Sequence, residues 1–188
     1  MARGRPQRSR EKPAHGHRPS PKARRRTLRF VGLFGLILIA SNVAYYQWIV
    51  GSRFFELYLS WSAAVARKGL DLVDLETGYR DGLLTGPFLM SIRAGCDGIQ
   101  AFAVLVAATL AFPVRLRARL AGILVGAVVI FVLNAARLAS LYWLGARQSS
   151  WFQAAHVHLW PAALILAMGA LWLGWAAIVE PARGPSRA

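Results

Sequence analysis

Residues 120–144, LAGILVGAVVIFVLNAARLASLYWL, determine how the rest of this chain is interpreted. As an α-helix this stretch would extend about 38 Å, which exceeds the roughly 30 Å hydrocarbon core of a bilayer. It contains a single charged side chain, Arg137, and Asn134 precedes that residue by a helical turn. The pattern predicts a transmembrane helix that carries a polar feature near one end.

Three further apolar segments have the same character, over residues 30–50, 99–112 and 157–179. The second of these is short, and we expect it to begin further back, near Ala94. The chain is 56% hydrophobic yet has a net charge of +15, a combination that is rare in soluble domains. We therefore expect an all-α integral membrane protein with about four transmembrane helices.

Basic residues are concentrated outside these segments. Residues 1–29 contain 11 of the 23 Lys and Arg residues and a single acidic residue, Glu11. We expect a disordered cytoplasmic arm there, a membrane-embedded domain over residues 30–179 and a cytoplasmic tail over residues 180–188. The alternative use of the arm is binding of nucleic acid or anionic lipid, but we expect no nucleic-acid partner.

The same charges predict the orientation of the chain. With four spans, the arm, the tail and the basic loop PVRLRAR at residues 113–119 share one side. The positive-inside rule makes that side cytoplasmic. Residues 51–95 and 145–156 then lie on the outer face of a multi-pass protein surrounded by membrane lipids.

The first outer segment has a pattern of its own. Phe54, Tyr58, Trp61 and Val65 recur at helical spacing, which predicts an amphipathic helix on the membrane surface. From residue 71 to 92 the apolar residues are interrupted by TG, DG and TGP, and this indicates a small hairpin-like excursion.

The excursion leads to Cys96, the only cysteine of the chain, at the outer start of the second span. In the predicted topology Arg137 lies near the outer end of the third span, and His156 and His158 lie at the outer start of the fourth. A thiol, a guanidinium and an imidazole thus meet at one membrane face. Helical residues two apart point about 200° from each other, so we expect only one of the histidines to face Cys96.

Each of these residues also has a purely structural interpretation. Cys96 can be an inert buried thiol, and Arg137 can reach the outer headgroups along its flexible stem. Asn134 can bond a neighbouring helix or orient the guanidinium of Arg137, and an interfacial histidine can be a solvated anchor. Insertion of a charged side chain into a membrane span costs about 2.5–3.5 kcal/mol, which favours a functional role for Arg137.

The neighbours of Cys96 favour a reactive thiol. Gly95 and Gly98 permit close approach of an extended substrate, and a cationic Arg137 or His156 would favour the thiolate. Asp97 opposes the thiolate unless a cation pairs with it. A lone cysteine without metal-type spacing predicts neither a disulfide nor a metal, and we expect no cofactor.

Three motifs, GCDGI at residues 95–99, NAARLASLYWLG at residues 134–145 and AAHVHLW at residues 154–160, resemble those of the exosortase/archaeosortase family. The similarity covers residues 30–179 and is greatest to the exosortase H subgroup. It implies a membrane cysteine transpeptidase or protease. Such enzymes cleave C-terminal sorting signals of exported proteins. Each signal comprises a short motif, a membrane span and a basic tail, and in substrates of the exosortase H subgroup the motif is of the IPTLxxWG kind.

The resemblance also implies roles for individual residues. Cys96 is the nucleophile that forms a thioester, Arg137 stabilises the oxyanion or positions the substrate, and His156 protonates the leaving amine. His158 falls where the subgroup more often has an aromatic residue, and Asp97 stands where Ser or Asn is commoner. The alternative is a non-catalytic membrane scaffold or subunit whose polar residues pack helices.

Overall fold

The computed structural model describes residues 21–179, so residues 1–20 of the predicted arm and the predicted tail lie outside the described residues. This part of the chain is mostly helical, and three of its helical segments are long and apolar enough to cross a membrane. The first is α1 (Pro21–Ala44) with the π-helical turn η1 (Tyr45–Ile49). The second is α4 (Leu116–Ala146). The third joins α5 (Trp151–Ala154), the π-helical turn η2 (Ala155–Leu159) and α6 (Trp160–Val179).

The remaining apolar helix is shorter than predicted. Helix α3 (Ile99–Ala111) has 13 residues and is about 20 Å long, less than the roughly 30 Å core of a bilayer. The expected extension back to Ala94 is wrong, because Gly98 has a left-handed φ of 75° and the residues before it form a turn. Four full spans are therefore not observed.

Two helices begin earlier than expected. Helix α1 starts at Pro21, so the last residues of the predicted disordered arm, 21–29, are helical. The third long segment starts at Trp151 and not near residue 157, which places Pro161 inside a continuous helical segment. Proline lacks an N–H and clashes with the preceding turn, and this accounts for the π-helical turn η2 immediately before it.

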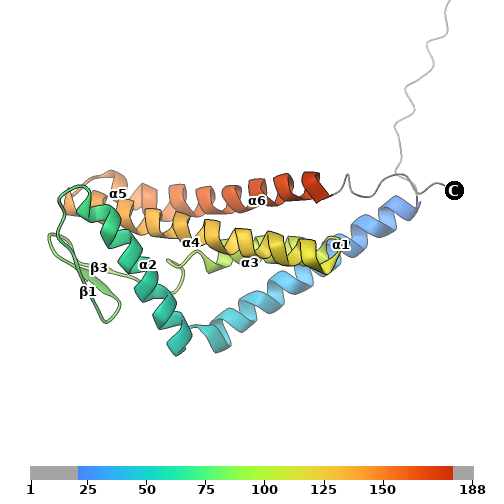
Figure 1. Cartoon of the computed structure of the whole chain (residues 1–188), viewed down its shortest axis with the longest axis horizontal. Helices are drawn as coiled ribbons and strands as arrows, with labels where there is room; N and C mark the ends of the chain where they lie inside the picture. Colours follow the sequence, from blue (N-terminus) through green and yellow to red (C-terminus); the bar gives the residue numbers. More distant parts are fainter. Residues whose placement is uncertain (1–20, 180–188) are drawn as a thin grey trace, which may run out of the picture.

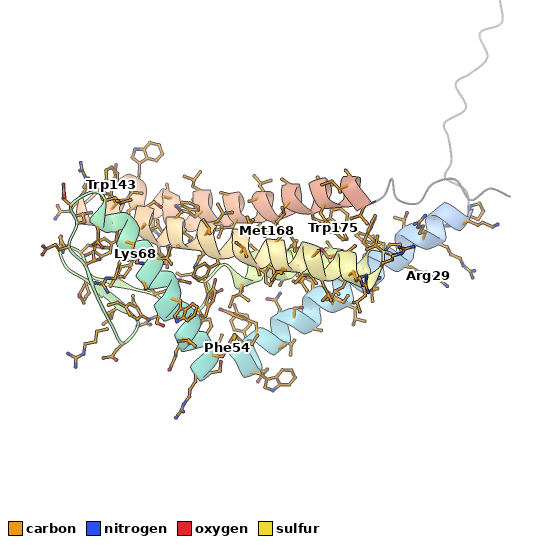
Figure 2. The ribbon with its side chains drawn as sticks, viewed as in Figure 1. Arg29, Phe54, Lys68, Trp143, Met168 and Trp175 are labelled. Carbon is orange, nitrogen blue, oxygen red and sulfur yellow. The ribbon has the colours of Figure 1, made fainter. Side chains whose placement is uncertain are left out.

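The amphipathic helix is confirmed as α2 (Arg53–Asp71), which begins where the Ser52 hydroxyl accepts the Phe55 N–H at 3.2 Å. This helix has two apolar faces. One packs on α4 and is buried, and it comprises Phe55, Leu59, Ala63, Ala66 and Leu70. The other is exposed and comprises Phe54, Leu57, Trp61 and Val65, with Phe54 at the end of α2 nearest to α1 (Figure 2).

The hairpin-like excursion is confirmed as a small antiparallel sheet in the order β1-β2-β3. Its strands are β1 (Gly78–Arg80), β2 (Leu83–Thr85) and β3 (Met90–Ser91). Asp81 and Gly82 both have positive φ, 51° and 78°, as a two-residue hairpin turn of this hand requires. Leu84 is fully buried and fixes the sheet to the core, so β3 delivers the chain to Cys96 from a defined position.

Two apolar clusters hold the helices together. One joins η1, α2, the sheet and the C-terminal half of α4, and the other joins α3, α4 and α6. Gly126 on α4 allows close approach of Leu105 on α3, and Gly122 allows close approach of Trp175 on α6, because a Cβ at either glycine would lie 2.7 Å from its neighbour. Small residues in such helices commonly serve this purpose.

The arrangement of the elements gathers the basic segments. The start of α1, the connection from α3 to α4 and the end of α6 lie toward one end of the molecule, whereas α2, the sheet and α5 lie toward the other (Figure 1). Arg29 on α1 and Trp175 on α6 mark the first of these ends (Figure 2). The candidate site lies between the sheet and the helices.

Candidate active site around Cys96

Cys96 lies on a tight turn between β3 and α3. Its N–H donates to the Arg93 carbonyl at 2.9 Å, and Gly95 and Gly98 on either side have φ values of 90° and 75°. These left-handed conformations strain any residue with a Cβ, so the glycines are required by the turn itself. The Cys96 side chain is half-buried, and the thiol is free.

Asp97, the residue after the cysteine, stabilises the turn through hydrogen bonds. Asp97 is fully buried, and its carboxylate accepts the Gly95 N–H at 2.9 Å and the Ile99 N–H at 2.7 Å. The Tyr45 hydroxyl donates to the same carboxylate at 2.5 Å. The negative charge of Asp97 was expected to disfavour a thiolate at Cys96 unless a cation paired with Asp97. The structure gives it neutral donors instead, and the start of α3 also favours a negative charge there.

A second tyrosine reaches the turn from α2. The Tyr58 hydroxyl donates to the Asp97 backbone carbonyl at 2.6 Å. Burial, assisted by the Asp97 carboxylate, raises the pKa of Tyr58 to about 12, so the hydroxyl keeps its proton at neutral pH. The sequence pattern placed Tyr58 on the membrane-facing stripe and gave Tyr45 no role. The structure corrects both assignments. Tyr58 and Tyr45 lie 39 and 52 residues before Asp97 in the sequence, and no local sequence pattern can predict contacts over such distances.

Arg137 approaches the turn from α4. Only 4% of its surface is exposed, and its Nη1 donates a long hydrogen bond of 3.5 Å to the Gly95 carbonyl. Its Nε is buried without a partner among the described residues. Arg137 is therefore not an arginine that extends to the headgroups. It places a positive charge beside the turn that carries Cys96.

The two histidines differ in their surroundings. The half-buried His156 ring stacks on Phe152 with the ring centroids 6.0 Å apart and 4° between the planes, and the charge of Arg137 acts on it. His158, two residues further along η2, is exposed. Arg137 thus bonds the Cys96 turn and acts on His156 through its charge, whereas His158 is exposed.

Asn134 is the least expected member of the group. The residue is fully buried on α4, but neither polar atom of its amide has a hydrogen-bond partner within residues 21–179. It therefore does not orient Arg137 through a bond. A Cβ on Gly98 would lie 3.2 Å from Ile130 and 3.5 Å from Asn134, so Gly98 serves the packing of the turn on α4. Around Gly95 the corresponding space is open.

The arrangement can support nucleophilic chemistry at Cys96. It offers a partly exposed thiol on a rigid turn, a buried cation beside that turn and a half-buried imidazole near the cation. Among the described residues, no three His, Cys, Asp or Glu side chains gather closely enough to hold a metal ion. Comparisons with protein families, curated proteins and solved structures found no match for this chain.

Proposed function

We propose that this protein is an exosortase-like membrane cysteine peptidase or transpeptidase that cleaves C-terminal sorting signals of exported proteins. The observation that carries the proposal is the half-buried Cys96 on a glycine-flanked turn against the buried Arg137. A charge sequestered in an apolar helix is costly and is typical of a functional site. The resemblance of the three motifs around Cys96, Arg137 and His156 supplies the reaction class.

The proposed reaction is acyl transfer in two steps. The Cys96 thiolate attacks a peptide carbonyl, the C–N bond breaks, and the amine departs with a proton while a thioester forms. His156 is the donor of that proton, and Arg137 stabilises the negative charge on the carbonyl oxygen. Water or an acceptor nucleophile then attacks the thioester, which releases the processed protein and restores the thiol.

The proposed site faces the exterior of the inner membrane, with the N-terminus in the cytoplasm. Support comes from the basic start of α1 and the basic connection from α3 to α4, which lie toward the end of the molecule opposite to the sheet (Figure 1). Positive residues mark cytoplasmic segments. In this arrangement α3 is the second membrane segment, and the turn at residues 93–98 completes its outer part.

Co-expression with a tagged reporter tests the proposal. The reporter ends in a candidate motif, a membrane span and a basic tail, and processing removes the tail and reduces its size. Cys96→Ala should abolish processing, while Arg147→Ala, a change at an exposed outer arginine, should retain it at equal membrane abundance. If Cys96→Ala still processed the reporter, the polar residues would only pack helices, as in the scaffold alternative.

A further inference from the structure

The Cys96 turn is held by groups from three separate helical elements. Tyr45 comes from η1, Tyr58 from α2 and Arg137 from α4, and all three bond the turn at Gly95 or Asp97. Asp97 is the centre of this arrangement, because its carboxylate joins the Tyr45 hydroxyl to the backbone on both sides of the cysteine.

We propose that Asp97, anchored by Tyr45 and Tyr58, is a positioning residue that fixes the direction of the Cys96 thiol and takes no proton in the reaction. This inference rests on the proposed function, in which Cys96 is the nucleophile. A residue that sets geometry within fractions of an ångström can control the rate without touching the substrate.

The hydrogen bonds argue against Asp97 as a base. Two backbone N–H groups and one hydroxyl already occupy the carboxylate oxygens. A proton taken from the thiol would have to compete with these three donors for the two carboxylate oxygens. As a fixed negative charge, Asp97 must disfavour the neighbouring thiolate, so its benefit to Cys96 has to be geometric.

Asp97 disfavours the thiolate form of Cys96, whereas the other groups around the thiol either favour that form or leave it unaffected. Arg137 on α4 favours the thiolate and acts also on His156 of η2. Tyr45 and Tyr58 face the turn as neutral donors. Removal of the Asp97 charge should therefore make Cys96 more acidic, whereas removal of a base should make the thiolate harder to form.

The first measurement is the pH dependence of Cys96 alkylation by a small reagent in purified full-length protein. Asp97→Asn should move the midpoint downward by about half a unit, while reporter processing falls at least about tenfold because the turn loses an acceptor. A midpoint that moved upward would show that Asp97 accepts the thiol proton and would overturn the proposal. The assay needs no substrate, so it decides the role of Asp97 even if the protein processes no reporter.

A matched pair of neighbouring tyrosines supplies the second measurement. The Tyr46 hydroxyl accepts a bond from Gln100 at 2.8 Å and does not contact Asp97, so Tyr46→Phe removes a hydroxyl beside the network. At equal abundance, Tyr45→Phe should reduce processing about tenfold and Tyr46→Phe less than about twofold. Equal processing by the two variants would overturn the positioning role. Tyr45→Phe also keeps the test open if Asp97→Asn fails to accumulate.

Discussion

The Tyr45 hydroxyl lies 2.5 Å from Oδ2 of Asp97, and this contact joins the first long helix to the turn that carries Cys96. It gives η1, the continuation of α1, a part in the candidate site. Because the Asp97 carboxylate also accepts the N–H groups of Gly95 and Ile99, the contact links η1 to the backbone on both sides of the cysteine.

The two histidines should not be equivalent. We expect His156→Ala to reduce reporter processing about a hundredfold or more, because it removes the proposed proton donor for the leaving amine. His158→Ala changes an exposed side chain and should leave processing within about twofold. The measurement is the processed fraction at equal membrane abundance. Equal losses would mean that both histidines act.

Arg137 should not tolerate even lysine. A guanidinium presents two parallel donors to a carbonyl or oxyanion, whereas lysine offers a single point charge of different reach. Loss of one oxyanion donor typically costs about a hundredfold in rate, and we expect a loss of that size in Arg137→Lys. Arg147→Lys, at an exposed position over the Trp143 ring, is the control. Near-normal cleavage by Arg137→Lys would contradict the assigned role.

Cys96 should react with a membrane-impermeant maleimide in spheroplasts without detergent. The thiol is half-buried on an outer turn in the proposed topology, and the space around Gly95 is open. Since the chain has a single cysteine, labelling reports on this residue alone, and Cys96→Ala is the blank. Labelling that required detergent would place the turn at the wrong depth or on the wrong side.

Alkaline phosphatase fusions should distinguish the two sides of the membrane. A fusion after residue 75, between α2 and β1, should be active because the proposed topology places that segment outside. A fusion after residue 114, between α3 and α4, should be inactive because the same topology places the basic loop in the cytoplasm. The reverse pattern would invert the topology, and activity in both would show that α3 does not cross the membrane.

Most of the fold was predictable from periodicity and turn chemistry. The long apolar helices, the amphipathic helix and the hairpin each depend on local sequence, such as the Asp81–Gly82 turn. The start of α3 was expected near Ala94, but the helix begins at Ile99. Gly98 has a left-handed backbone conformation, which ends the preceding turn and forms the N-cap of α3. The fourth apolar segment was expected to begin at residue 157, but the helix starts at Trp151 and the structure accommodates Pro161 with a π-helical turn.

The site was predictable only in part. Topology brought Cys96, Arg137 and His156 to one end of the molecule, because charges set orientation and helices have a fixed rise. The tyrosine contacts to Asp97 could not be predicted, since an interfacial tyrosine usually marks the membrane surface and contacts over such sequence distances depend on tertiary packing. The sequence allowed Asn134 either to bond a neighbouring helix or to orient Arg137, and among residues 21–179 its amide makes neither bond.

In the proposed reaction Cys96 forms a covalent thioester with the substrate. The direct measurement is to capture the protein with a tagged reporter, treat it with neutral hydroxylamine and determine the masses of the products by mass spectrometry. Hydroxylamine attacks a thioester to give a hydroxamate and a free thiol. We expect a reporter fragment ending in a hydroxamate from the wild type and none from Cys96→Ala. A processed reporter with no fragment linked through Cys96 would show that no thioester forms.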